Sequence, residues 1–447
     1  MTRRRSTHYE EPPAPASLIK LIHEMASPLE RSEDLDPLLD KIGNARYVLL
    51  GEASHGTADY YTWRAQLSQR LIEEKGFRAI AVEGDWPDCY RVNRFIRHLP
   101  NADQSAREAL YAFKRWPTWM WGNTEVEALT TWLRDYNTDQ PESRQVGFYG
   151  LDVYSLWESL FAIIAYLKQA QPDSLKAALA AFRCFQPYGE SGQDYARATM
   201  LVPTNCQEEV LRLLVRLRRD IATGATGEGP EDAFNAEQNA VVVRDAEAYY
   251  RTMVRGDRQS WNVRDHHMMQ TLDRIMAHLG SEAKAIVWEH NTHVGDARFT
   301  DMADGGMVNV GELTREAHGV DGVVLVGCSS YSGTVIAGRE WDAPMEVMTV
   351  PPARPDSWEE VLHRSSQTNK LLLLDQARGT PDFLTERGHR AIGVVYNPEY
   401  ERFGNYVPSV LPKRYDALLY IDRTEALHPL AIKPDLRETP ETFPSAM

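Results

Sequence analysis

The residues best suited to chemistry in this chain are histidines and carboxylates that follow short apolar runs. The sequence GEASHGT (51–57) follows the run YVLL, and Glu83 ends the run AIAVE. Glu289, His290 and His293 follow the run AIVW. Ligands collect at the carboxyl ends of the strands in an open α/β sheet. We therefore expect these side chains to share one edge of a sheet.

A histidine in the first of these turns is a candidate general base. Gly51 and Gly56 permit a tight turn and a close approach of the chain around His55. Glu52 is near enough to fix the tautomer of the imidazole and to stabilise its protonated form. The alternative is a turn histidine whose ring only caps the next helix. The matching polar ends of the other apolar runs favour the catalytic interpretation.

His290 and His293 are separated by two residues, and this spacing is compatible with three interpretations. The pair can bind a divalent metal ion, with Glu52, His55 or Glu83 completing the site. The pair can instead donate hydrogen bonds to a carbonyl oxygen or an oxyanion. Both residues can also be solvated loop histidines. The H-E-x-x-H pattern of zinc proteases is absent, which disfavours a protease.

Three further segments contribute candidate residues. Arg64, in the helical pattern after the first run, can reach the site or remain at the surface. In SWNVRDHHM (260–268), Arg264 and Asp265 can form a buried pair or orient a residue of the site. The stretch RWPTWMWGN (115–123) predicts either a core corner or the wall of an apolar pocket. Its three tryptophans leave open a protein that binds an aromatic or macrocyclic ligand without turning it over.

Composition and motifs disfavour several other classes of protein. The 447 residues contain 49 Lys and Arg against 64 Asp and Glu, and the formal charge of −15 disfavours nucleic-acid binding. Neither the GxSxG motif of serine α/β-hydrolases nor a nucleotide-binding glycine pattern occurs. The four cysteines form no CxxC pair, so we expect reduced thiols, no thiolate zinc site and no disulfide framework.

The elements that must position the candidate residues alternate along the chain. Short apolar runs that predict buried strands are followed by stretches of helical length, such as 57–75 and 122–137. These runs lie at 47–52, 77–85, 146–152, 284–290 and 322–330, and four more strands are predicted at 346–350, 370–375, 389–395 and 416–422. This alternation predicts the α/β fold class, with a mixed or parallel β-sheet core flanked by helices.

The predicted chain divides into a core and an inserted lobe. Long helix-forming segments between 154 and 280 predict a helical lobe over the cleft, within the same domain. The catalytic core then comprises 18–153 and 281–447. Residues 1–17 contain several prolines and predict a flexible N-terminal arm. This arm has no apolar core of a signal peptide, and no apolar run is long enough to span a membrane. We therefore expect a cytoplasmic protein, and the sequence does not indicate its oligomeric state.

Four parts of the chain together resemble the erythromycin esterases. These are GEASHGT (51–57), Arg64, VEGDW (82–86) and WEHNTHVGD (288–296). In order along the chain they give Glu-x-x-His, an arginine nine residues after that histidine, a strand-end glutamate and a distant His-x-x-His. The resemblance covers roughly residues 18–425. The stretches 113–126, 184–196 and 260–268 look closer to chromosomal homologues of unassigned substrate.

The resemblance implies a carboxylic-ester hydrolase that opens an ester or a lactone, as the family does with erythromycin-like antibiotics. It implies that His55 is the general base activating water, without a covalent intermediate. The other site residues implied are Glu52, Glu83, Arg64, His290 and His293. No cofactor is expected; if a divalent metal binds, its ligands are expected from His55, Glu83, His290 and His293. The expected partner is a small ester or macrolactone, with no nucleic acid and no membrane.

Overall fold

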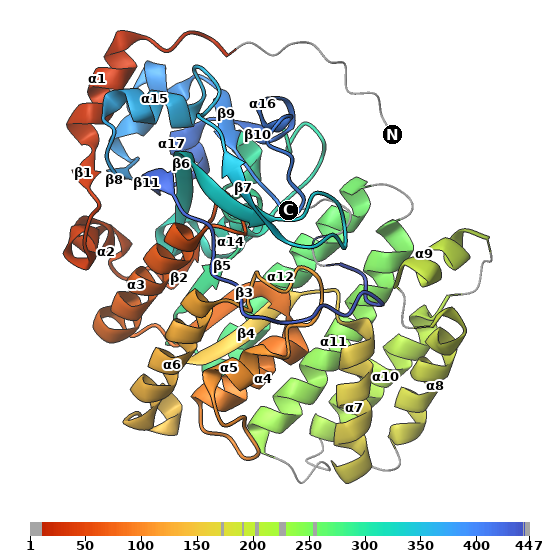
Figure 1. Ribbon diagram of the computed structural model, residues 1–447. Helices are drawn as coiled ribbons and strands as arrows, with labels where there is room; N and C mark the ends of the chain where they lie inside the picture. Colours follow the sequence, from red (N-terminus) through yellow and green to blue (C-terminus); the bar gives the residue numbers. More distant parts are fainter. Residues whose placement is uncertain are drawn as a thin grey trace.

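The computed structural model describes residues 11–440 and 442, except 171–173, 190–191, 202–204, 223–228 and 254–256. In this part of the chain, nine strands form one mixed sheet with helices on both of its faces (Figure 1). No helix in the described ranges is long and apolar enough to cross a membrane. The predicted fold class is confirmed.

The sheet has the order β1-β8-β11-β6-β2-β5-β3-β4, and β7 pairs with β6 off this path. Six neighbouring strands are parallel: β11 (Ala417–Thr424), β6 (Val323–Ala337), β2 (Tyr47–Leu50), β5 (Ala285–Trp288), β3 (Ala79–Asp85) and β4 (Gly147–Asp152). Three strands pair antiparallel with their neighbours: β1 (Ser27–Pro28), β8 (Lys370–Leu373) and β7 (Glu346–Val350). A separate two-stranded sheet contains β9 (Arg387–Arg390) and β10 (Tyr406–Ser409). The carboxyl ends of the parallel strands thus meet at one edge.

Side chains alternate between two apolar cores on the two faces of the sheet. Val48 and Leu50 belong to one cluster, whereas Tyr47 and Leu49 belong to the other. One face carries α2 (Asp36–Ile42), α3 (Ala58–Lys75) and α6 (Thr124–Thr138). The other carries α1 (Ala16–Met25), α12 (Asp257–Leu279), α14 (Val310–His318) and α15 (Trp358–Ser365). Burial on both faces explains why these strands read as continuous apolar runs.

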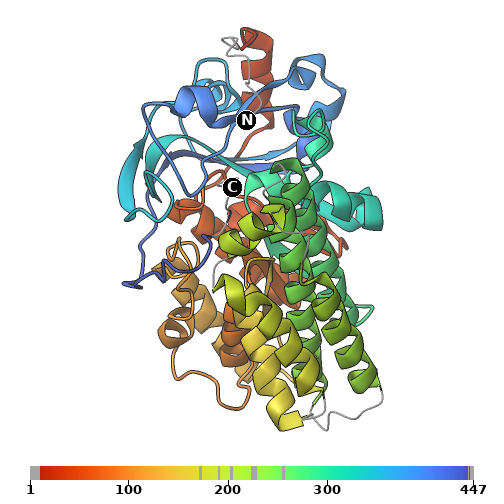
Figure 2. The same ribbon diagram turned by 90° about the vertical axis from the view of Figure 1, so that its right-hand side faces the viewer.

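The helical lobe has an apolar cluster of its own. It contains α7 (Leu156–Ala170), α8 (Leu175–Phe185), α9 (Gly192–Leu201), α10 (Gln207–Ala222) and α11 (Pro230–Met253). These helices lie beside the end of the sheet formed by β3 and β4 (Figures 1 and 2). By contrast, α12 places Met268, Leu272 and Ile275 in the core of the sheet. The division into core and lobe stays a prediction, and α12 packs with both.

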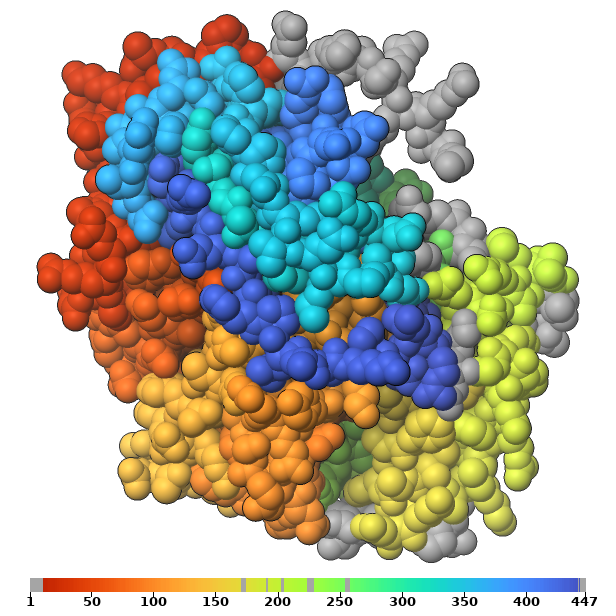
Figure 3. Space-filling model, viewed as in Figure 1, coloured from red at the N-terminus to blue at the C-terminus, as the bar shows by residue number. Residues whose placement is uncertain are grey.

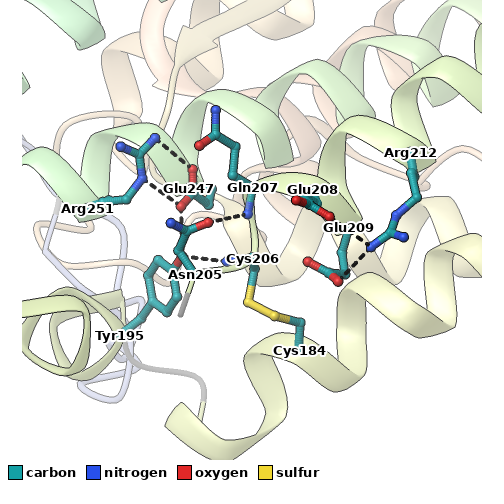
Figure 4. The surroundings of a disulfide bond; sticks show 10 residues. All are labelled: Cys184, Tyr195, Asn205, Cys206, Gln207, Glu208, Glu209, Arg212, Glu247 and Arg251. Carbon is teal, nitrogen blue, oxygen red and sulfur yellow. Dashed lines mark hydrogen bonds and ion pairs between the residues drawn. A yellow bond between two sulfur atoms is a disulfide. The ribbon is translucent and has the colours of Figure 1, made fainter. Parts of the chain in front are cut away.

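A disulfide joins Cys184 and Cys206, which corrects the expectation that all four thiols are reduced (Figure 4). The two cysteines are separated by 22 residues, so no short spacing motif indicates the pair. The packing of α8 against α10 brings them together within the lobe. Cys89 and Cys328 are buried and carry reduced thiols, as predicted.

The described part of the N-terminal arm makes several contacts with the core. Glu11 is only 8% exposed; it pairs with Arg354 and accepts a hydrogen bond of 2.9 Å from the backbone of Gly388. Arg387 donates to the carbonyl oxygen of Pro12. α1 then begins at residue 16, inside the predicted arm. Residues 1–10 lie outside the described residues.

Candidate active site

His55 and Glu52 form a buried pair in the turn after β2. Nδ1 of His55 lies 3.0 Å from Oε1 of Glu52, and Nη2 of Arg64 donates to the other carboxylate oxygen at 2.6 Å. A carboxylate only accepts hydrogen bonds, so Nδ1 carries the proton and Nε2 presents a lone pair. That Nε2 is buried and has no hydrogen-bond partner among the described residues. The pair therefore has the arrangement that a general base requires.

Arg64 lies within the site rather than at the surface, because its helix faces the core. The side chain is 1% exposed, and its guanidinium lies over the rings of Tyr61 and Trp288, at 4.3 and 4.6 Å from their centroids. Its hydrogen bond ties the carboxylate of Glu52 to α3. Of the two sequence interpretations for this residue, the structure supports the buried one.

His290 has the opposite tautomer from His55. The backbone N–H of Thr292 donates to Nδ1 of His290, so the ring proton lies on Nε2. Burial and the neighbouring His55 lower the pKa of His290 well below its usual value, which keeps the ring neutral. The two ring centroids are 4.9 Å apart, and the ring of His290 also makes a hydrogen bond with the backbone of Ala53. A lone pair and an N–H donor thus lie side by side.

Glu83, at the end of β3, is held by two donors. Arg264 donates to Oε1 at 2.6 Å, and the backbone N–H of His290 donates to Oε2 at 2.8 Å. Burial alone raises the pKa of Glu83, but His293 and Arg264 outweigh it and hold the pKa well below its usual value. Arg264 also pairs with Asp152 at the end of β4, at 2.7 Å. Arg264 therefore connects α12 to two strand ends.

His293 is engaged on both ring nitrogens. Nδ1 lies 2.8 Å from Asp265, and Nε2 lies 3.0 Å from Nη1 of Arg264 and 3.6 Å from Glu83. Burial lowers the pKa of His293, but the Asp265 and Glu83 carboxylates overcome this and raise it to about 9. The ring stacks on Trp261 at 4.5 Å. His293 thus resembles a buried support for Glu83 more than a donor to substrate.

The four proposed metal ligands do not fit a metal ion as the structure places them. Both oxygens of Glu83 accept hydrogen bonds, and both nitrogens of His293 have neighbours. In the described ranges, no group of three or more His, Cys, Asp or Glu side chains is arranged to hold a metal.

The tryptophan-rich stretch forms a corner of the core, which was the first of its two interpretations. Trp116, Trp119 and Trp121 are 1–3% exposed and belong to the apolar cluster on the α3 face. Nε1 of Trp121 donates to the backbone oxygen of Glu83 at 3.0 Å. The stretch supports a site residue from behind rather than lining a pocket with its rings.

A segment after β11, which we call the C-terminal strap (425–439), crosses both the site turn and the tryptophan-rich stretch. Leu427 donates to the backbone oxygen of Gly56 at 3.0 Å, and Leu430 donates to that of Gly122 at 2.7 Å. Figure 3 shows the strap in dark blue across one face of the molecule. Nothing in the sequence indicated it, because its bonds to Gly56 and Gly122 are made by the backbone.

Asn291 is the site residue that the sequence analysis missed. It stands between the two histidines, is fully buried, and makes hydrogen bonds to the turn that carries Glu52 and to Cys328 in β6. The sequence offered only its place between the two candidate histidines; the structure adds that a Cβ on Gly51 would meet its amide oxygen at 2.1 Å.

Fold and site together define an α/β protein with a buried histidine–carboxylate site at the carboxyl ends of its parallel strands. The model of the erythromycin esterase family matches residues 72–424, and the chain belongs to this family of hydrolases. The resemblance seen in the sequence is thereby confirmed. The roles of the individual site residues stay predictions.

Individual relatives are distant. The chain is 24% identical over 329 residues to an erythromycin esterase type II of Escherichia coli, covering 69% of this chain and 75% of that protein. It is 21% identical over 435 residues to a putative hydrolase, YbfO, of Bacillus subtilis strain 168, covering 90% of each. A mutant of the erythromycin esterase EreC, solved in its open conformation, shares the fold with a TM-score of 0.66 at 16% identity. That match covers 96% of this chain and 99% of the EreC chain.

Proposed function

We propose that this protein hydrolyses a carboxylic ester or lactone by a histidine-activated water, without a covalent intermediate and without a metal. The observation that carries the proposal is the pair of ring nitrogens on His55 and His290. Nε2 of His55 presents a lone pair that has no partner among the described residues, and Nε2 of His290, beside it, carries an N–H. Membership in an esterase family supports a small-molecule substrate, and we propose a macrolactone or a smaller ester.

The proposed reaction uses each nitrogen once. Nε2 of His55 removes a proton from water, and the resulting hydroxide attacks the carbonyl carbon. The developing oxyanion accepts a hydrogen bond from Nε2–H of His290. When the tetrahedral intermediate collapses, the C–O bond to the alcohol breaks and His55 returns its proton to the leaving oxygen. Glu52 stabilises the imidazolium that forms between the two steps.

The surroundings of His55 support water as the nucleophile. The hydroxyls of Ser54 and Thr57, in the same turn, hydrogen-bond to each other. The thiol of Cys328 is buried, and burial raises its pKa to about 12, so it is a poor nucleophile. No side chain in the described ranges hydrogen-bonds to Nε2 of His55.

The test is mass spectrometry of a macrolide and lactone panel after incubation with wild type, His55→Ala and His266→Ala, each with and without EDTA. His266 is exposed on α12 and serves as the matched histidine control. We expect a gain of one water with wild type and His266→Ala, in the presence or absence of EDTA. We expect His55→Ala to lose at least about 10²-fold in rate while its folding is retained.

Three outcomes contradict the proposal. Full activity in His55→Ala removes the general base. Loss of wild-type activity in EDTA, restored by a divalent ion, establishes a metal-dependent hydrolase instead. Saturable binding with unchanged ligand after long incubation establishes a binding protein, which is the interpretation that the tryptophan content first suggested.

A further inference from the structure

Asn291 lies at the point where β2, β5 and β6 separate. Its backbone N–H donates to the carbonyl oxygen of Glu52 at 2.8 Å. The preceding N–H, that of His290, donates to the carboxylate of Glu83. Two consecutive peptide groups therefore bind the backbone of one site acid and the side chain of another.

The side-chain amide of Asn291 hydrogen-bonds to β6 as the backbone of a neighbouring strand would. Its Nδ2 donates to the carbonyl oxygen of Cys328 at 2.7 Å, and its Oδ1 accepts from the N–H of Cys328 at 3.2 Å. The amide thus pairs with both backbone groups of one residue of β6, beyond the end of β2. Its own carbonyl oxygen accepts from Arg414 at 3.0 Å. The residue is anchored on three sides.

Gly51 leaves the space that this arrangement requires. A Cβ at position 51 meets Oδ1 of Asn291 at 2.1 Å, so the amide would have to shift, and it meets the backbone oxygen of Val326 at 3.3 Å. Gly51 is also the residue before Glu52. The glycine of the first motif and the asparagine of the last motif therefore fit one another.

We propose that Asn291 is a positioning residue that fixes the distance and mutual orientation of the His55–Glu52 pair and His290. The kinetic consequence rests on the proposed function; the positioning itself does not. Without the amide, the turn after β5 loses its connection to β6. The ring of His290, which follows the same backbone, then moves relative to His55, and a displacement of about 1 Å at such a site costs up to roughly 10²-fold in rate.

The chain offers a matched control for this proposal. Asn137 is also fully buried, and its amide pairs with both backbone groups of Val146, at 2.8 and 2.9 Å. It lies before β4, at the opposite end of the strands from the site. Asn137→Ala removes the same kind of amide–peptide pair, so it reports the purely structural cost.

The first measurement needs no substrate. Ring ¹⁵N NMR of histidine-labelled protein, assigned with His55→Gln and His290→Gln, reports the tautomer of each ring. In wild type we expect Nε2 of His55 and Nδ1 of His290 to be unprotonated. In Asn291→Ala and Asn291→Asp we expect both signals to shift toward tautomer-averaged positions. Asn137→Ala should leave them unchanged while lowering the melting temperature to a similar extent.

The second measurement is kinetic, on any ester that the panel identifies. We expect kcat to fall about 10- to 100-fold in Asn291→Ala with little change in KM. Gly51→Ala should have the same effect by displacing the amide. Asn291→Ala also removes the atom with which a Cβ at position 51 clashes. The kcat of the double variant Gly51→Ala/Asn291→Ala should therefore be no lower than that of either single variant, which is a non-additive result.

Unchanged ring signals in folded Asn291→Ala and Asn291→Asp overturn the proposal, and so does equal sensitivity of Asn137→Ala. If wild type hydrolyses no ester, the proposed function fails, but the ring signals still decide the role of Asn291. If Asn291→Ala does not fold, Asn291→Asp and Gly51→Ala provide the same comparison.

Discussion

Three histidines of the site share a residue type but differ in their hydrogen-bond partners. The Glu52 carboxylate accepts from Nδ1–H of His55, a backbone N–H donates to Nδ1 of His290, and two carboxylates raise the pKa of His293. The sequence predicted that these residues belong to one site. It could not predict their different roles, because each role depends on one contact from a distant or irregular piece of backbone.

The role of Glu52 gives a prediction at this scale. Glu52→Gln keeps the shape of the side chain but allows its amide to donate to His55, which favours the wrong tautomer. We expect kcat for ester hydrolysis to fall roughly 10²- to 10⁴-fold, as for a misoriented catalytic histidine. Steady-state kinetics beside Glu282→Gln, an exposed control, measures the effect. An activity equal to that of the control would show that the carboxylate has no such role.

At the scale of elements, the strands were predictable and the strap was not. Apolar runs bounded by glycine or acidic residues mark the buried strands, and a strand overlaps each predicted range. β6 and β11 extend beyond the predicted ends at 330 and 422, and β9 is displaced toward the N-terminus of 389–395. The strap has no such pattern, since its bonds to Gly56 and Gly122 involve only backbone atoms. Its position depends on where β11 ends, which only the sheet order determines.

A buried charge cluster connects the strap to three other elements. Arg115 pairs with Asp85 at the end of β3, Glu158 on α7 and Glu438 on the strap, at 2.5, 3.2 and 3.6 Å. Burial raises the pKa of Asp85 to about 6, against the effect of Arg115. Burial, assisted by Glu438, raises the pKa of Glu158 to about 7. The single positive charge of Arg115 therefore does not balance the negative charges of all three carboxylates.

This cluster predicts a pH dependence of stability with a definite sign. Between about pH 4.5 and 7, Glu158 holds a proton in the folded state that it loses in the unfolded state. The free energy of unfolding therefore falls as pH rises through this window. Glu158→Gln removes the group that titrates. We therefore expect the free energy of unfolding of this variant to exceed that of wild type by roughly 1–2 kcal/mol at pH 8 and not at pH 4.5. Urea unfolding at both pH values, with Glu282→Gln as control, measures the difference; an equal difference at both pH values would contradict the assignment.

At the scale of the whole molecule, the sheet core and the lobe have different sources of stability. The core relies on two large apolar clusters around the sheet, whereas the lobe adds a disulfide to its own smaller cluster. Composition and helical periodicity predicted the lobe. They could not predict the disulfide, because cysteine pairing across 22 residues depends on how α8 and α10 pack.

The disulfide gives a prediction for the lobe alone. A cross-link that closes a loop of this length contributes about 3 kcal/mol in the chain-entropy model. Cys184→Ser/Cys206→Ser should therefore increase amide hydrogen exchange in α8, α9 and α10 by a large factor. Exchange in β2, β5 and β6 should stay unchanged. Hydrogen-exchange mass spectrometry of both proteins measures this, and uniform loss of protection across the sheet would show that core and lobe unfold as one unit.

The place of β11 in the sheet bears on how the protein is made. β11 is the last strand of the described chain, yet it lies between β6 and β8, and β1 reaches the sheet only through β8. During translation, β1 and β8 can thus pair only with each other, and this pair stays separate from the rest of the sheet until the ribosome has released residues 417–424. A nascent chain stalled after β8 exposes bare strand edges of the kind that aggregate or recruit chaperones. The same strand leads into the C-terminal strap. The strap therefore binds the backbone of Gly56 only after every residue of the site has been synthesised.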